Sequence, residues 1–242
     1  MSNRDLADFS ALTFDCYGTL IDWETGIWDA LQPLLMTNPG RAVDRIPALA
    51  AFGEAESAEQ LAHPETLYPG ILAAVHRAIA ASFGLRTDAA LDEAFGASVQ
   101  HWPAFPDTAG ALRRLKKRYR LVILSNVDRA GIAASSRKLG VEFDAVCTAQ
   151  DIGSYKPDAR NFAYMIEHLA GLGIDAGRIL HTAQSLRHDH VPARAAGLAN
   201  AWIDRQGQSE GGDWGATAPV ADMPEFDFIF PTLEAMADAA GL

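Results

Sequence analysis

Short apolar runs, each long enough for one buried strand, recur along the second half of the chain. They cover residues 120–125 (RLVILS), 144–149 (DAVCTA), 178–183 (RILHTA), 198–203 (LANAWI) and 226–230 (FDFIF). Between most of them, as at 109–119 and 158–173, apolar residues recur at the three- and four-residue spacing of amphipathic helices. Strands that alternate with helices predict a parallel sheet covered on both faces. Residues 10–14 (SALTF) add one more strand near the start of the chain.

The stretch from about residue 20 to about residue 105 has a different pattern. It is rich in alanine, its apolar residues recur at helical spacing, and it has almost no strand signals. The prolines of WPAFPDT (102–108) interrupt the helical pattern before the next helix of the core. We therefore expect an α/β fold, in which residues 1–19 and 106–242 form a Rossmann-like parallel-sheet core. A helical cap, residues 20–105, is inserted after the first strand, and the glycine-rich stretch 205–219 is expected to be an exposed loop.

Composition and charge narrow the possible partners. Of the 242 residues, 49% are hydrophobic and 21% are charged, which is typical of a soluble globular protein. The net charge of −11 disfavours nucleic acid and anionic membranes as partners. No apolar run approaches the roughly 18 residues of a membrane span, and MSNRDLADFS lacks the pattern of a signal peptide. We expect a cytoplasmic protein whose two cysteines, Cys16 and Cys147, are buried and not paired.

Polar residues with chemical potential follow four of the expected strands. They are Asp15 and Thr19 after the first, Ser125 and Asn126 after 120–125, Lys156 after 144–149, and Gln184, Ser185, His188 and Asp189 after 178–183. Each alone could be a helix cap or a surface residue. Ligands of open parallel sheets bind beyond the carboxyl ends of the strands, so the four sets together predict a site there.

These stretches resemble the four signature motifs of the haloacid dehalogenase superfamily. FDCYGTL, LSN, YKP and the acid-containing loop after RILHTA occur in the same order and at similar spacing, over essentially the whole chain. The resemblance implies that Asp15 is a nucleophile, which forms an ester that water later hydrolyses. It also implies that Lys156 offsets the charge of Asp15, and that Thr19 and Ser125 orient its oxygens.

The residue two positions after Asp15 bears on the reaction. Phosphatases of this superfamily carry a second aspartate there, which protonates the leaving alkoxide, whereas this chain has Tyr17. A phenol with a pKa of about 10 does not perform that task near neutral pH. A phosphatase is therefore disfavoured, and the motif resembles that of the L-2-haloacid dehalogenases, which act at carbon.

The fourth motif departs from the dehalogenase pattern. Those enzymes have Ser-Ser-Asn-x-x-Asp where this chain has QSLRHD, and Phe162 stands where they have a tyrosine. The wider sequence more closely resembles L-azetidine-2-carboxylate hydrolases, a sister group that opens a strained ring by attack at a carbon next to nitrogen. We therefore expect ring opening of L-azetidine-2-carboxylate, with L-2-haloacid hydrolysis as the alternative. A catalytically silent relative that binds a small acid is a third reading.

Either reaction implies a small-molecule carboxylate as substrate. Its binding residues are expected among Tyr17, Thr19, Trp23, Ser125, Asn126, Gln184 and Ser185. An ammonium substrate would need an acid or an aromatic face, for which Asp22, Trp23 and Glu24 are candidates. Dehalogenases hold the halide with an arginine early in the cap, and Arg41 and Arg45 lie near that position.

The second step and the cofactors complete the expectations. We expect His188 to activate the water that attacks the Asp15 ester, with Asp189 positioning it, since an imidazole that titrates near neutrality suits a general base. Asp189 alone remains of the acids with which related phosphatases hold magnesium, so no metal or other cofactor is expected. Dehalogenase relatives often pair through their cap helices, which implies a possible homodimer.

Overall fold

A six-stranded, fully parallel sheet forms the centre of the computed structural model, which describes residues 4–212 and 220–242. Its strand order is β3-β2-β1-β4-β5-β6, and each pair of neighbours is parallel. The strands are β1 (Ala11–Phe14), β2 (Arg120–Ser125), β3 (Ala145–Thr148), β4 (Ile179–Ala183), β5 (Ala199–Ile203) and β6 (Phe228–Phe230). Each expected apolar run contains one of them, so the predicted α/β fold is confirmed. Residues 213–219 of the expected exposed loop lie outside the described residues.

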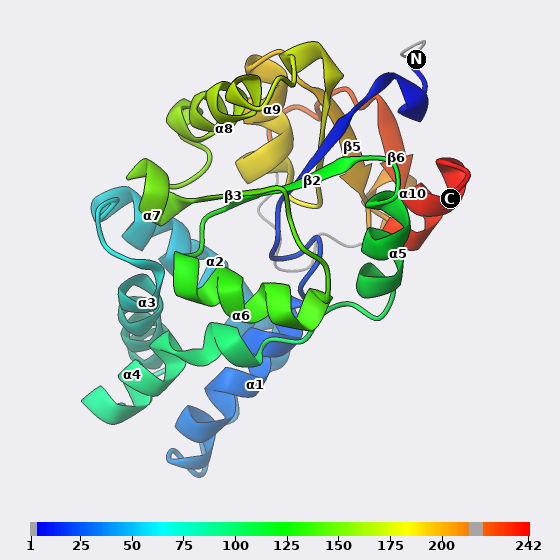
Figure 1. Ribbon diagram of the computed structural model, residues 1–242. Coiled ribbons are helices and arrows are strands. Elements are labelled where there is room, and N and C mark those ends of the chain that lie inside the picture. Colours follow the sequence, from blue (N-terminus) through cyan, green and yellow to red (C-terminus); the bar gives the residue numbers. More distant parts are fainter. Residues whose placement is uncertain (1–3, 213–219) are drawn as a thin grey trace.

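Helices cover both faces of this sheet, because its strands alternate between two apolar cores. Leu121 and Ile123 of β2 face one cluster, and Val122 and Leu124 face the other. In Figure 1, α8 and α9 lie above the sheet, and α5 and α6 lie below it. The core helices are α5 (Thr108–Leu115), α6 (Arg129–Leu139), α7 (Ala149–Ile152), α8 (Ala159–Gly171), α9 (Val191–Ala195) and α10 (Leu233–Ala239).

Four helices between β1 and β2 form a separate layer beyond one end of the sheet (Figure 1). They are α1 (Trp23–Met36), α2 (Arg45–Ala62), α3 (Tyr68–Ser82) and α4 (Ala89–Gly96). The outgoing and returning segments are paired by an antiparallel bridge between Ile21 and Ala104 and by the hydrogen bond from Phe105 N–H to Leu20 O. This pairing fixes the point from which the helical layer extends over the carboxyl end of β1.

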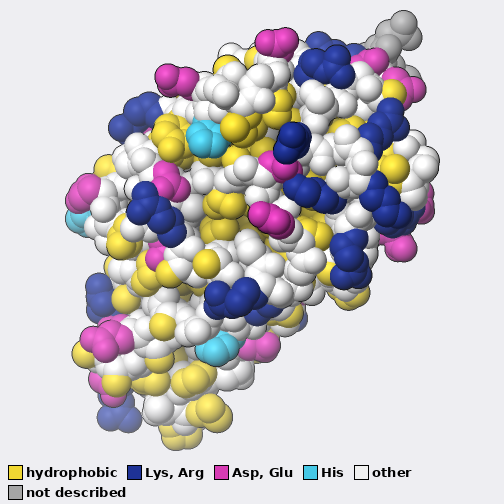
Figure 2. Space-filling view, in the orientation of Figure 1, with side chains coloured by type: hydrophobic (Ala, Val, Ile, Leu, Met, Phe, Trp, Pro, Cys, Tyr) yellow, Lys and Arg dark blue, Asp and Glu magenta, His cyan; other side chains and the backbone are white. Residues whose placement is uncertain are grey.

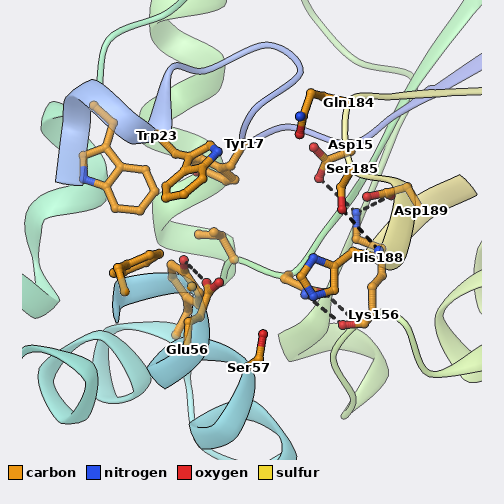
Figure 3. A pocket seen from close by; sticks show the side chains of 16 residues that line it. Asp15, Tyr17, Trp23, Glu56, Ser57, Lys156, Gln184, Ser185, His188 and Asp189 are labelled. Atoms are coloured by element: carbon orange, nitrogen blue, oxygen red, sulfur yellow. Dashed lines mark hydrogen bonds and ion pairs between the residues drawn. The ribbon is translucent and has the colours of Figure 1, made fainter. Parts of the chain in front are cut away.

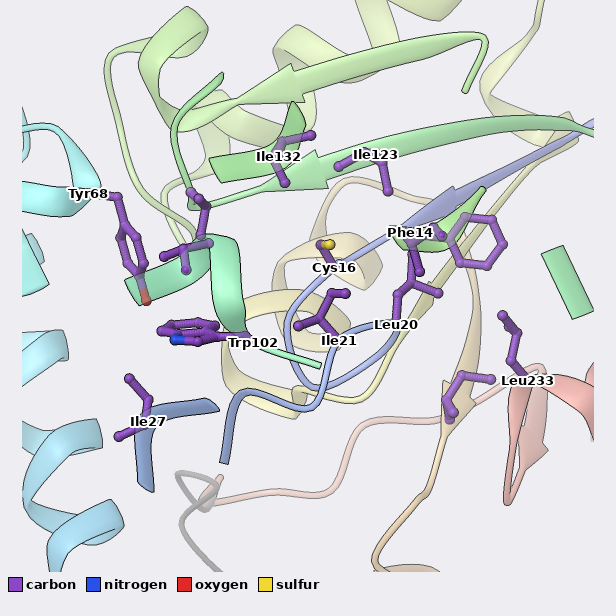
Figure 4. Packing of buried hydrophobic residues seen from close by; sticks show 14 of the residues in the cluster. Phe14, Cys16, Leu20, Ile21, Ile27, Tyr68, Trp102, Ile123, Ile132 and Leu233 are labelled. Atoms are coloured by element: carbon purple, nitrogen blue, oxygen red, sulfur yellow. The ribbon is translucent and has the colours of Figure 1, made fainter. Parts of the chain in front are cut away.

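Trp102, on the returning segment, packs at the junction between cap and core. Its side chain is fully buried, its indole N–H donates to Ser98 Oγ at 3.1 Å, and the Tyr17 ring meets it edge-on at 5.4 Å. Figure 4 shows it beside Tyr68 and Ile27 of the cap. A Cβ on Gly26 would lie 2.3 Å from Trp102 Cγ, so only a glycine permits this packing.

The surface carries both signs of charge. On the face shown in Figure 2, Lys and Arg side chains gather in the region of α5. Several of them have acidic partners, since Arg114 pairs with Asp238, and both Lys116 and Arg120 pair with Asp144. Among the described helices, none has the length and apolar character needed to cross a bilayer. Cys16 and Cys147 are both buried and free, as expected.

Candidate active site

Asp15 lies immediately beyond the end of β1, where it is 7% exposed. Its backbone N–H continues the sheet by donating to Thr182 O at 3.1 Å. One carboxylate oxygen, Oδ1, accepts from Lys156 Nζ at 2.9 Å, and Oδ2 accepts from the Thr19 hydroxyl at 2.9 Å. Both expected partners, Lys156 and Thr19, therefore hold the carboxylate in one orientation.

Lys156 is the centre of the buried charge arrangement. Its ammonium donates to Asp15 Oδ1, to Asp189 Oδ1 at 2.6 Å and to Leu124 O at 3.1 Å, and it is 2% exposed. Burial alone would lower the pKa of Lys156, but the two carboxylates outweigh it and raise the pKa. Burial raises the pKa of Asp15 above its ordinary value, although Lys156 opposes this shift. The lysine is therefore a permanent cation at the floor of the site.

Asp189 is a second counterion of Lys156, a role that the sequence did not suggest. It accepts from Lys156 and, at 3.0 Å, from the imidazole Nε2–H of His181. The other ring nitrogen of His181, Nδ1, is hydrogen-bonded to Thr13 Oγ1 at 2.9 Å. Burial would raise the pKa of Asp189, but Lys156 and His181 hold it well below its ordinary value. The aspartate thus positions Lys156, and its expected part in positioning the water stays a prediction.

His188 lines the pocket as expected, but its electrostatics differ from the prediction. Its backbone N–H donates to Ser185 Oγ at 3.2 Å, and its imidazole borders the cavity. Burial lowers the pKa of His188 to about 4, so the ring does not titrate near neutrality. It is a neutral imidazole over the whole ordinary working range of pH.

Of the other predicted core residues, Asn126 and Gln184 line the pocket and Ser125 does not. Asn126 clamps the lysine backbone, because its Oδ1 accepts from Lys156 N–H at 2.7 Å and its Nδ2 donates to Lys156 O at 3.2 Å. Gln184 lines the pocket, and its backbone N–H donates to Thr19 Oγ1 at 2.9 Å. Ser125 instead accepts from Val127 N–H at 3.1 Å and lies outside the pocket lining, so it shapes the loop without touching Asp15.

Tyr17 supplies no acid to the site. Its hydroxyl is hydrogen-bonded to Ser135 Oγ at 2.9 Å. Burial, with smaller contributions from neighbouring groups, raises the pKa of Tyr17 well above 10. The phenol therefore keeps its proton and forms part of the wall.

A cavity of about 110 Å³ opens above Asp15, between the core and the cap (Figure 3). This is somewhat smaller than the roughly 150 Å³ cavity that holds benzene in other proteins. The core side carries Asp15, Tyr17, Asn126, Val127, Lys156, Gln184, Ser185, His188 and Asp189. The cap and its hinge contribute Trp23, Phe52, Gly53, Glu56, Ser57, Tyr68 and Trp102. A space of this size suits a ligand of few heavy atoms.

Sequence reasoning named Trp23 but missed most of the cap wall. Phe52 and Glu56 are four residues apart on α2 and so lie on one face, which is a signal that the sequence carries. Asp22, proposed for an ammonium, caps α1 by accepting from Thr25 N–H, and Glu24 accepts from Gln206 Nε2. Neither acid lines the pocket.

The arginines expected for a halide are also elsewhere. Arg41 and Arg45 are both exposed, and Arg45 donates to Thr25 Oγ1 at 3.2 Å. Among the described residues that line the pocket there is no arginine.

A divalent cation fits this donor set poorly. Asp15 has Oδ1 bound to Lys156 and Oδ2 bound to Thr19, and Asp189 has Oδ1 shared between Lys156 and His181. Asp189 Oδ2 is buried with no hydrogen-bond partner in the described part of the chain. Residues 4–212 and 220–242 contain no group of three or more acids, histidines or cysteines placed to hold a metal. Magnesium is coordinated by oxygen ligands in octahedral geometry, and the carboxylate oxygens of Asp15 and Asp189 are not arranged to provide them.

Comparison with known proteins gives one family. The model of the haloacid dehalogenase-like hydrolases matches residues 9–197. (S)-2-haloacid dehalogenase H-109 of Pseudomonas putida is 31% identical over 127 residues, which is 51% of this chain. The match spans 55% of that relative's length.

Two solved structures show the same fold. L-2-haloacid dehalogenase PA0810 has a TM-score of 0.76 at 23% identity, over 96% of this chain and 99% of its own. The Xanthobacter autotrophicus L-2-haloacid dehalogenase with chloropropionic acid covalently bound has a TM-score of 0.77 at 19% identity, over 96% and 98%. At these identities the likeness concerns the fold.

Proposed function

Because the chain belongs to the haloacid dehalogenase-like hydrolases, we propose that it hydrolyses a small 2-substituted carboxylate by attack of Asp15 on carbon. The observation that carries the proposal is the arrangement of Asp15 at the cavity floor. Its carboxylate is held by a buried cation, and the residue two positions on is a tyrosine whose proton is not available. This arrangement favours a leaving group that departs without help from the core.

The first step forms a bond between an Asp15 oxygen and C2 of the substrate, while the bond from C2 to the leaving group breaks and its electron pair departs with that group. Burial makes the carboxylate a poorly solvated, reactive nucleophile. As Asp15 loses its charge on becoming an ester, Lys156 keeps Asp189 as its counterion. Before the step, Asp15, Asp189 and Lys156 together carry a net charge of −1, and after it Lys156 and Asp189 balance each other.

In the second step water attacks the carbonyl carbon of the Asp15 ester, which releases a 2-hydroxy acid and restores the carboxylate. Two groups could accept the proton of the water. One is the neutral imidazole of His188, and the other is Asp189 Oδ2, which has no partner in the described ranges. We favour His188, because its ring is unprotonated at neutral pH and its pKa of about 4 is higher than that of Asp189, which Lys156 and His181 hold well below its ordinary value. The cycle needs no metal or organic cofactor.

We propose a strained ring amine, L-azetidine-2-carboxylate, as the first substrate. The cap wall presents an acid, Glu56, and the described lining contains no arginine. Such a wall suits a cationic leaving nitrogen better than a departing halide.

L-2-haloacid hydrolysis is the second candidate, and the observation that favours it is the similarity to haloacid dehalogenases in sequence and fold.

The test is a single-turnover incubation in H₂¹⁸O, with enzyme in excess, of L-azetidine-2-carboxylate, L-2-chloropropionate and p-nitrophenyl phosphate. The proposal expects label in the Asp15 carboxylate and none in the product after this single turnover, and labelled product only when substrate is in excess and each enzyme molecule turns over repeatedly. Immediate labelling of product with none in the protein would refute the covalent step. Turnover of the phosphate ester alone would refute attack at carbon, and turnover of none, with ligand binding intact, would identify a silent relative.

A further inference from the structure

Glu56 lies at the wall of the pocket and is an acid that forms no ion pair with any described residue. It lies in the middle of α2, one helical turn after Phe52, and its side chain borders the cavity from the cap side (Figure 3). Its Oε1 accepts a hydrogen bond from the Tyr68 hydroxyl at 2.5 Å. Tyr68 is 4% exposed, so this hydroxyl is a fixed donor.

No cation balances this carboxyl in the part of the chain that the structure describes. Burial raises the pKa of Glu56 to about 7, although the hydrogen bond from Tyr68 opposes this shift. The one charged group that acts on Glu56 is Asp15, which is also an acid and raises its pKa further. Tyr155 is close enough for Glu56 to raise its pKa, but its hydroxyl donates to Thr66 O. Glu56 is only partly exposed, and an acid in such a place that lacks a counterion is costly unless a ligand supplies the positive charge.

The geometry of displacement places the leaving group on this wall. Attack at saturated carbon occurs from the side opposite the departing bond, and Asp15 attacks from the floor formed by the core. The group that leaves therefore points toward the cap, where Glu56 and Tyr68 lie.

We propose that Glu56 is the specificity-determining residue that binds the amine nitrogen of the substrate, and that Tyr68 is the positioning residue that orients it. This inference rests on the proposed attack of Asp15 and extends it to the leaving group. The ring ammonium donates an N–H to the free oxygen of Glu56. When the C2–N bond breaks, the nitrogen keeps the electron pair as a neutral primary amine, which then takes a proton from solvent. A departing chloride would meet a negative wall.

The test uses ligands that cannot react, so that it does not depend on turnover. L-Proline carries the same ammonium and carboxylate in a nearly strain-free ring, and cyclopentanecarboxylate has a similar ring without nitrogen. Titration calorimetry at pH 8 should show that Glu56→Gln weakens proline binding by at least about tenfold, the loss expected for a hydrogen bond between charged groups. Cyclopentanecarboxylate should bind Glu56→Gln at least as well as the parent protein.

Two further variants complete the design. Glu54→Gln removes an exposed acid from the same helix and should leave both affinities unchanged. Tyr68→Phe should weaken proline binding a few-fold and should raise the pH midpoint of that binding, because the hydroxyl no longer lowers the pKa of Glu56. Besides burial, the groups that set this midpoint are Tyr68 and, from the core, Asp15; Tyr155 is also nearby, and Glu56 raises its pKa.

Equal proline affinity in Glu56→Gln, Glu54→Gln and the parent protein would overturn the inference, as would equal losses for both ligands. Proline binding that depends on Glu56, in an enzyme that turns over no azetidine substrate, would support the amine site and refute the ring-opening reaction. If Glu56→Gln does not fold, Glu56→Asp, which keeps the charge on a shorter side chain, should lose proline affinity and spare cyclopentanecarboxylate. Unchanged proline binding in that variant would count against the site.

Discussion

Replacing Glu56 by glutamine should change the pH dependence of folding stability in a way that needs no knowledge of the substrate. In the folded protein burial raises the pKa of Glu56 from 4.5 to about 7. Between these two values the folded state holds a proton that the unfolded state has lost. The free energy of unfolding contributed by this group therefore falls as pH rises through that window. Glutamine has nearly the same shape and can still accept from Tyr68, but it does not titrate.

The magnitude follows from the size of the pKa difference. Because folding raises the pKa of Glu56 from 4.5 to about 7, deprotonation of this group lowers the free energy of unfolding of the protein by about 3 kcal/mol. Glu56 keeps an edge on a cavity that admits water, so we take this value as the ceiling and expect at least about 1 kcal/mol. In a chain of this length, 1 kcal/mol corresponds to about 2–4 °C in Tm.

Urea unfolding at pH 5 and at pH 8 measures the effect, with Glu54→Gln as the control from the same helix. The stability of Glu56→Gln relative to the parent protein should increase between the two pH values, and that of Glu54→Gln should not. Contributions from titrating groups that do not interact with Glu56 are common to all three proteins and cancel, so the difference reports Glu56 together with its coupling to Asp15. If the free energy of unfolding of Glu56→Gln differs from that of the parent protein by the same amount at both pH values, the pKa of Glu56 is not raised. The conclusion that this acid lacks a counterion would then also be refuted.

Other consequences concern the nucleophile, the water, the packing and the metal. Asp15→Asn should lower turnover by at least about 10⁴-fold while proline still binds in calorimetry; retained turnover would remove Asp15 from the reaction. His188→Ala should let an adduct on Asp15 accumulate in the mass spectrum of the intact protein, and full turnover without adduct would assign the water to Asp189. Gly26→Ala should destabilise the protein by about 1–3 kcal/mol in urea unfolding, because the new methyl group displaces Trp102; unchanged stability would contradict that packing. Treatment with EDTA followed by gel filtration should leave turnover unchanged, whereas loss that Mg²⁺ restores would contradict the metal-free cycle.

The apolar runs of the sequence predict both the strands of the sheet and the residues that lie at its carboxyl edge, where the floor of the site is formed. A parallel strand is a short apolar run, and the residue that follows it emerges at the carboxyl edge of the sheet. Asp15 directly follows such a run and Lys156 lies on the segment after β3, so both were expected at this edge, whereas their ion pair at 2.9 Å was expected only from the family resemblance. His181 was missed because it lies inside a run, where its polar side chain reads as an ordinary buried residue of β4.

The cap wall could not be predicted in this way. Helical periodicity indicates which face of α2 is buried, but not whether that face meets another helix or a cavity. The hinge acids Asp22 and Glu24 were the nearest in sequence to Asp15, yet capping and side-chain bonds direct them elsewhere. The lowered pKa of His188 could not be predicted either, because the burial that lowers it is a property of the folded chain and not of the loop sequence.

The proposed reaction places the attacking carboxylate in the core and the leaving group beside the cap helices. In the proposed reaction, the motifs that follow the strands hold the attacking carboxylate. The residues opposite the attack come from α2 and α3, whose packing constrains shape more than charge. A change at position 56 from an acid to a base would leave the floor with Asp15 and Lys156 intact while it reversed the charge presented to the leaving group. Two proteins with this fold can therefore share the nucleophile and differ in the bond they break, and the charge on the cap wall is the feature by which their substrates should be told apart.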